Sequence, residues 1–129
     1  MSKTILILED EQPLIEVIAA KLKLNGFEVV SAREVDQALD YIKEIPIDCV
    51  WLDHYLLGKK NGLDFIVELK KHEKYKKIPI FVVSNTASPD KIKSYLGLGV
   101  EKYYTKANIR LDETIMDIKT LLEKGGLNG

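Results

Sequence analysis

The sequence predicts an α/β fold: a doubly wound parallel sheet of five strands with five helices on its two faces. Short apolar runs alternate with longer stretches in which apolar residues recur at helical spacing. The short runs are apolar throughout, which is typical of strands that are covered on both faces. Polar and charged residues follow the carboxyl ends of these runs, where open parallel sheets keep their binding sites.

Size and composition fit one globular domain. The chain has 129 residues, 46% hydrophobic and 30% charged, with a net charge of −1, so bulk charge indicates neither a nucleic-acid nor a membrane partner. The single Cys49 excludes an intrachain disulfide and is expected to be buried. No run approaches the roughly 20 apolar residues of a membrane span. Because Thr4–Leu8 is also too short for the core of a signal peptide, we expect a cytoplasmic location.

The first half of the chain alternates strand and helix, beginning and ending with a strand. Its strands are the apolar runs Thr4–Leu8, Phe27–Val30 and Cys49–Leu52. The first helix starts near Pro13, because proline lacks the N–H that a first helical turn leaves unpaired, and it ends at Asn25-Gly26. Ser31 and Glu34 have the spacing of a capping box, and the helix that follows repeats apolar residues up to Ile42.

The second half repeats this pattern with the strands Ile78–Val83 and Val100–Thr105. A helix over about 62–71 precedes the first of them. Ser88-Pro89-Asp90 starts the next helix, with a hydroxyl at the N-cap, proline at the first position and an acid in the first turn. The last helix starts near Asp112 and is expected to end at Gly125-Gly126. This ending divides the chain into one domain over 1–124 and a flexible tail or linker stub over 125–129.

Polar side chains follow four of the predicted strands. They are Glu9 and Asp10 after the first strand, Asp53 after the third, Ser84 after the fourth and Lys106 after the fifth. Because the carboxyl ends of parallel strands meet at one edge of a sheet, we expect these side chains to lie together. Three carboxylates in one cleft repel one another unless a cation lies between them or one takes up a proton. A ligand set made only of oxygen atoms suits Mg²⁺.

The same cluster has the groups that phosphoryl transfer requires. Mg²⁺ and the Lys106 ammonium would offset the charge of a phosphoryl group, and the Ser84 hydroxyl would donate a hydrogen bond to it. Asp53 is then placed as a carboxylate nucleophile. The alternative for Asp53 alone is a turn residue, since aspartate is common after strands.

With these residues at successive strand ends, the sequence resembles the receiver domain of response regulators in two-component signalling over essentially its whole length. The matching features are Glu9-Asp10-Glu11, Asp53, the loop ending in Asn61-Gly62, Ser84, and Tyr103 three residues before Lys106. The resemblance implies the flavodoxin-like receiver fold, with the strand order 2-1-3-4-5.

The resemblance also implies roles for these residues. Asp53 would accept a phosphoryl group from a phosphohistidine on a histidine kinase or a histidine phosphotransfer protein. Glu9, Asp10, Asp53 and the backbone carbonyl of Tyr55 would bind Mg²⁺, and Lys106 and Ser84 would hold the phosphoryl oxygens. Tyr103 would turn inward behind a displaced Ser84 and alter the face of the fourth helix, fifth strand and fifth helix, which a downstream output protein or domain would read. Such a chain is a switch and not an enzyme.

Three positions depart from the pattern of this family. Ala107 follows Lys106 where the family usually has proline, so we expect a trans peptide and a reshaped loop. Asn85 replaces a small residue, and Tyr55 is bulky; both would border the phosphoryl group and shield it from water.

Two other functions stay open. The first is a receiver-like interaction module that is never phosphorylated. The presence of both Asp53 and Lys106 is evidence against it. The second is a Mg²⁺-dependent phosphohydrolase of the haloacid-dehalogenase type. That class expects another aspartate two residues after the nucleophile, where this chain has Tyr55.

Several single residues have simpler interpretations. His54 is predicted to be a non-catalytic loop residue that points away from the site. Tyr95 and Tyr103 are either packed core tyrosines or, with Ile92 and Ile109, contact residues of the face that would bind an output partner.

Overall fold

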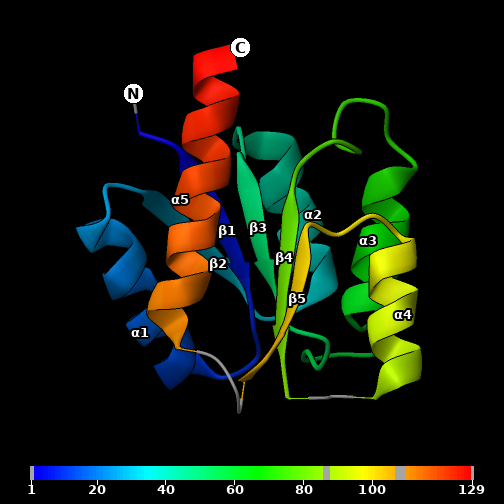
Figure 1. The fold of residues 1–129 in the computed structure, drawn as a ribbon. Helices are drawn as coiled ribbons and strands as arrows, with labels where there is room; N and C mark the ends of the chain where they lie inside the picture. The colour runs from blue at the N-terminus through cyan, green and yellow to red at the C-terminus, as the bar shows by residue number, and fades with distance from the viewer. Residues whose placement is uncertain (1, 86–87, 107–109, 129) are drawn as a thin grey trace.

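The computed structural model describes residues 2–85, 88–106 and 110–128, the last four of them without side chains. Five parallel strands form one sheet in the order β2-β1-β3-β4-β5, as expected (Figure 1). The strands are β1 (Thr4–Leu8), β2 (Glu28–Ala32), β3 (Cys49–Leu52), β4 (Ile80–Ser84) and β5 (Lys102–Thr105). The helices are α1 (Gln12–Leu24), α2 (Val35–Glu44), α3 (Gly62–Lys70), α4 (Pro89–Gly97) and α5 (Leu111–Asn128).

The helices cover both faces of the sheet, α1 and α5 on one face and α2, α3 and α4 on the other (Figure 1). Alternate strand residues face opposite layers, as the pleat of a strand requires. On β3, Trp51 packs with the α1 and α5 side chains, whereas its neighbours Val50 and Leu52 pack with those of α2, α3 and α4. The doubly wound fold class predicted from the sequence is confirmed.

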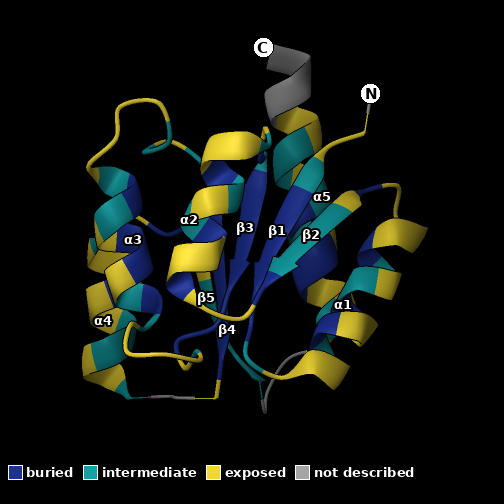
Figure 2. Cartoon of the chain, turned by 180° about the vertical axis from the view of Figure 1, so that it is seen from behind, coloured by how far each residue is buried: buried dark blue, intermediate teal, exposed yellow. Residues whose placement is uncertain are grey.

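Burial of the strands follows their place in the sheet. The residues of β3 and β4 are all buried, whereas the edge strands β2 and β5 keep exposed and half-buried residues (Figure 2). This difference explains why the central strands are continuous apolar runs in the sequence. Cys49 is fully buried and its thiol is free, as expected for a small core residue.

The predicted capping box of Ser31 and Glu34 is wrong. β2 continues to Ala32, because Ser31 pairs with Ile7 and Ala32 with Leu8 in the parallel ladder, so Ser31 belongs to the strand. Glu34 is itself the N-cap of α2, and its side chain makes no capping bond.

A capping box does occur at α3. The Asn61 side chain accepts a hydrogen bond from the Asp64 N–H, while the Asp64 carboxylate accepts one from the Asn61 N–H. This reciprocal pair fixes the start of α3 directly after the loop that follows β3.

The last helix is longer than the sequence predicted. α5 runs to Asn128 and passes through Gly125-Gly126, where we expected it to end. Glycine costs roughly 1 kcal/mol per residue in a helix interior but leaves the backbone N–H and C=O groups able to pair. The proposed division of the chain at residue 124 stays a prediction.

Within the described residues, no helix is both long enough and apolar enough to span a lipid bilayer.

Candidate functional site

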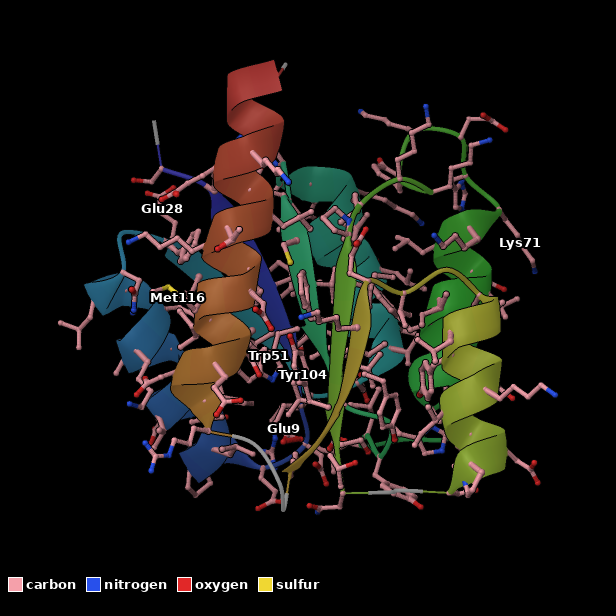
Figure 3. The ribbon with its side chains drawn as sticks, in the orientation of Figure 1. Glu9, Glu28, Trp51, Lys71, Tyr104 and Met116 are labelled. Carbon is pink, nitrogen blue, oxygen red and sulfur yellow. The ribbon has the colours of Figure 1, made fainter. Side chains whose placement is uncertain are left out.

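β1 and β3 end level with each other, whereas β4 and β5 run two residues further at the same edge of the sheet, because Leu52 pairs with Val82. Leu8 pairs with Leu52 across β1 and β3, and Ser84 pairs with Thr105 across β4 and β5. The Asp53 N–H extends the ladder by donating to the Leu8 carbonyl at 2.9 Å. Residues that directly follow these strands therefore meet at this carboxyl edge, where Figure 3 labels Glu9.

Three carboxylates converge there. Glu9, Asp10 and Asp53 each offer an oxygen within 4.8 Å of the others. Glu9 is only 1% exposed and Asp53 only 3%, whereas Asp10 is half-buried. The structure thus brings together the three carboxylates that the sequence placed after β1 and β3.

Lys106 is the cation of the cluster. Its Nζ lies 2.6 Å from Glu9 Oε1 and 3.2 Å from Asp53 Oδ2, and the side chain is 15% exposed. Burial acts to lower the pKa of Lys106, but the hydrogen bond to Glu9 and the charge of Asp53 more than offset it, so the pKa rises. Lys106 therefore stays charged beside the two buried acids.

Negative charge remains in excess at this edge. Burial raises the pKa of Glu9 to about 9, with a further increase from its hydrogen bond to Asp53 and an opposing effect of Lys106. One ammonium cannot balance three carboxylates, so the cluster favours a bound cation or a proton on Glu9. The donor set contains only oxygen atoms and fits Mg²⁺ better than Zn²⁺ or copper.

Ser84 is the last residue of β4, and Tyr103 lies within β5, where it pairs with Val82. Ser84 is fully buried, and its side chain interacts with Tyr103. Burial raises the pKa of Tyr103, while the Ser84 side chain acts to lower it. The Tyr103 ring also packs at 5.7 Å from the ring of Tyr95, centroid to centroid.

His54 follows Asp53 in the loop after β3, as predicted, and its side chain has a buried partner that the sequence did not indicate. His54 is only 5% exposed, and its Nδ1 lies 2.7 Å from the Tyr95 hydroxyl on α4. Burial, with a contribution from the charge of Lys91, lowers the pKa of His54 and thereby favours the neutral imidazole. The side chain of His54 does extend away from the carboxylate cluster, but it reaches a second buried polar group instead of solvent.

Tyr95 is fully buried as well, so it belongs to the core and is not a contact residue of an external face. The same correction follows from its packing, because Tyr95 belongs to the core cluster formed with α2 and α3. Ile92 is half-buried, whereas Ile109 and Ala107, where a trans peptide and a reshaped loop were expected, lie outside the described residues.

Two further contacts brace the loops around the cluster. The Arg33 guanidinium donates two hydrogen bonds to the Asp10 carbonyl, at 2.9 and 2.7 Å. The Arg33 carbonyl accepts from the Leu57 N–H at 3.0 Å, which ties the loop after β3 to the loop after β2. Arg33 was not predicted as a residue of the site. The sequence indicates it only as a positively charged residue in the loop after β2, the strand that pairs with β1.

The Tyr55 side chain is half-exposed at this edge of the sheet and contacts Lys91 of α4. Lys91 Nζ donates to the Tyr55 hydroxyl at 3.0 Å and lies 4.9 Å from the centre of the ring. The Tyr55 ring meets the His54 ring edge to face at 4.8 Å. A bulky side chain two residues past Asp53 is therefore fixed next to the acceptor loop.

Comparison with known proteins gives one consistent family. The family model described as "Response regulator receiver domain" matches residues 5–119. The phosphate regulon transcriptional regulatory protein PhoB of Escherichia coli K12 is 32% identical over 106 residues, which are 82% of this chain and 46% of that protein. The chain therefore spans about half the length of this relative.

Solved structures agree with that comparison. The phosphorylated cyanobacterial phytochrome response regulator RcpA has a TM-score of 0.79 and 28% identity, over 95% of this chain and 93% of that one. A CheY-like receiver domain protein from Methanospirillum hungatei JF-1 has a TM-score of 0.88 at 21% identity, with full coverage of both chains.

Proposed function

We propose that this chain, which belongs to the response regulator receiver domain family, is a phosphoacceptor switch with Asp53 as the acceptor. The phosphoryl donor would be a phosphohistidine on a partner histidine kinase or histidine phosphotransfer protein. The observation that carries the proposal is the contact of Lys106 Nζ with Asp53 Oδ2, inside a cluster of three converging carboxylates. A nucleophile, a cation and an acidic oxygen set meet there at the edge of the sheet.

The transfer itself needs little protein chemistry. A carboxylate oxygen of Asp53 forms a bond to phosphorus as the bond from phosphorus to the donor imidazole nitrogen breaks. The imidazole leaves with the electron pair of that bond. Positioning and charge compensation supply most of the rate in reactions of this kind. Asp53 is held for in-line attack because it is buried and its carboxylate is fixed from two sides, by Lys106 and by the His54 N–H.

Mg²⁺ would be held by Glu9, Asp10 and Asp53, with the backbone carbonyl of Tyr55 as a further ligand, and would offset charge on the phosphoryl oxygens. Lys106 would hold one phosphoryl oxygen, and the buried Ser84 hydroxyl would donate to another. Arg33 would support this site indirectly, because it fixes the backbone of Asp10.

The output would be a change in the face formed by α4, β5 and α5. Ser84 and Tyr103 are the switch residues of this proposal: Ser84 moves toward the phosphoryl group and Tyr103 turns inward behind it. A downstream protein or domain would then bind the two states of this face with different affinity, as any switch requires.

The test is covalent labelling of the full chain. Wild type treated with acetyl phosphate and Mg²⁺ should gain one phosphoryl adduct by mass spectrometry, and Asp53→Asn should gain none. Asp40→Asn, which changes an exposed aspartate on α2, is the matched control and should label like wild type. If wild type shows no adduct, the chain is an unphosphorylated interaction module. Steady release of phosphate from an external ester would identify a phosphohydrolase.

A further inference from the structure

A buried hydrogen bond connects the residue after the acceptor to helix α4. His54 Nδ1 and the Tyr95 hydroxyl oxygen lie 2.7 Å apart, and the two rings meet edge to face at 86°. Tyr95 is fully buried and His54 nearly so, so neither group can replace this partner with water. A tyrosine hydroxyl both donates and accepts, so it completes the bond with either tautomer of a neutral imidazole.

The backbone of His54 is equally fixed. Its N–H donates to Asp53 Oδ1 at 2.8 Å, and its carbonyl accepts from the Gly62 N–H at 3.0 Å. Since Oδ1 of Asp53 is held by this N–H, its Oδ2 is the oxygen that faces Lys106, at 3.2 Å. A displacement of His54 would therefore rotate the Asp53 carboxylate relative to Lys106.

The Tyr95 hydroxyl packs directly against the backbone of Gly62. A Cβ atom at Gly62 would overlap the Tyr95 hydroxyl oxygen and would lie 2.8 Å from the Asp53 carbonyl oxygen. The Tyr95 hydroxyl thus occupies the space in which a side chain at position 62 would lie. The start of α3, the last turn of α4 and the acceptor loop all meet at this point, so the contact belongs to the packing of three segments.

We propose that His54 and Tyr95 are positioning residues for the acceptor: the Tyr95 hydroxyl holds His54, and the His54 N–H holds the Asp53 carboxylate toward Lys106. This inference rests on the proposed function of Asp53 as phosphoacceptor. It gives α4 a direct connection to the acceptor loop. The connection uses other residues than Ser84 and Tyr103, the switch residues proposed above, although the Tyr95 and Tyr103 rings pack 5.7 Å apart.

The test removes only the hydroxyl. Tyr95→Phe keeps the ring and should slow adduct formation on Asp53 from acetyl phosphate about tenfold at saturating Mg²⁺, because small displacements of reacting groups cost large factors in rate. Tyr104→Phe is the matched control. It removes another tyrosine hydroxyl that is bonded to a side chain, Asp117 on α5, away from the acceptor, and it should leave the rate unchanged.

A double-mutant cycle separates positioning from packing. His54→Leu should also slow labelling, and adding Tyr95→Phe to it should cause no further loss, since the hydroxyl no longer has its partner. The amide signal of His54 and the carboxyl carbon signal of Asp53 in NMR spectra should shift in Tyr95→Phe and stay in place in Tyr104→Phe. Circular dichroism at the assay temperature confirms that the compared variants are folded.

The outcomes distinguish this inference from the proposed function. Tyr95→Phe that labels at the wild-type rate, or a double variant that is slowed by the product of the two single effects, would overturn the positioning role. A wild type that gains no adduct, with Asp53→Asn as reference, overturns the proposed function and the inference together.

Discussion

Lys106 Nζ lies 2.6 Å from Glu9 Oε1, so the cation that would hold a phosphoryl group is paired with a proposed metal ligand. Glu9 is buried, at 1% exposure, and Lys106 is partly buried, at 15%. Lys106 also contacts Asp53, and therefore offsets part of the charge of both acids while the third acid, Asp10, has no such contact with it. Repulsion that remains among the carboxylates is the physical basis of the first prediction.

Mg²⁺ should stabilise the folded chain. Because the converging carboxylates exist only in the folded state, a Mg²⁺ concentration ten times the Kd should raise the free energy of unfolding by about 1.4 kcal/mol. Asp10→Ala should abolish this increment, and Asp40→Asn on α2 should keep it. Thermal unfolding at low ionic strength, with and without millimolar Mg²⁺, measures the effect. A wild-type curve that is indifferent to Mg²⁺ would count against the metal site.

Gly62→Ala should destabilise the fold by about 1–3 kcal/mol, since the added methyl group meets the Tyr95 hydroxyl and the Asp53 backbone and forces them to move. Gly97→Ala is the matched control at the end of α4, where an added Cβ has no neighbour within 4 Å. That variant should instead gain about 0.5–1 kcal/mol by restricting the unfolded chain. Urea unfolding of both variants gives the comparison, and equal free energies for the two would show that the space at residue 62 is not restricted.

Phosphorylated Asp53 should be long-lived. The Tyr55 side chain, held by the Lys91 ammonium, lies beside the acceptor loop and supplies no carboxylate or short amide to orient an attacking water. Tyr55→Asn should therefore lose its phosphoryl group faster than wild type, on the order of tenfold. The decay of the adduct in Mg²⁺ buffer, followed by mass spectrometry, tests this. An unchanged or slower decay would mean that Tyr55 does not cover the path of the water.

Tyr103 should affect how a partner binds the phosphorylated state, but not the phosphorylation of Asp53. Tyr103→Ala should leave the labelling of Asp53 intact while it reduces the difference in partner affinity, or in self-association, between the two states. A reduction on the order of tenfold is expected if this side chain carries most of the coupling. Titrations of a partner with both forms of wild type and variant measure it. If the variant keeps the full difference, Tyr103 is a core residue only.

Acid should weaken the contact between β5 and α5. The hydrogen bond from Tyr104, with a smaller contribution from Lys102, holds the pKa of Asp117 below its ordinary value of 3.8. A lowered folded-state pKa adds stability above the unfolded-state pKa, and this stability is lost as the pH falls through the folded-state value. Asp117 is partly exposed, so the contribution is on the order of 0.5 kcal/mol.

Asp117→Asn should therefore be less stable than wild type at pH 6, and the difference should shrink below pH 4. Urea unfolding at several pH values measures it, with Asp40→Asn as the exposed control. A difference between wild type and Asp117→Asn that is the same at pH 3 and pH 6 would contradict the prediction.

The fold class and the residues of the acidic cluster could both be predicted from the amino-acid sequence alone. Continuous apolar runs identify the strands that are covered on both faces, and in a parallel sheet the residues after those runs must share one edge. Glu9, Asp53 and Lys106 could be grouped for that reason alone, although they are far apart in the chain. Strand ends were less certain: β2 reaches Ala32, beyond its apolar run, because pairing with β1 continues to Leu8.

Contacts between side chains of different elements, in contrast, could not be predicted and became known from the folded structure. His54 and Tyr95 are 41 positions apart, and Arg33 and Asp10 are 23 apart. Local periodicity shows which face of a helix is buried, but not which atom of a neighbouring loop that face meets. That contact depends on how α4 packs against the sheet and α3, and hence on the space left by Gly62. Such a contact is a property of the packed core as a whole, because close packing fixes each side chain through all of its neighbours at once.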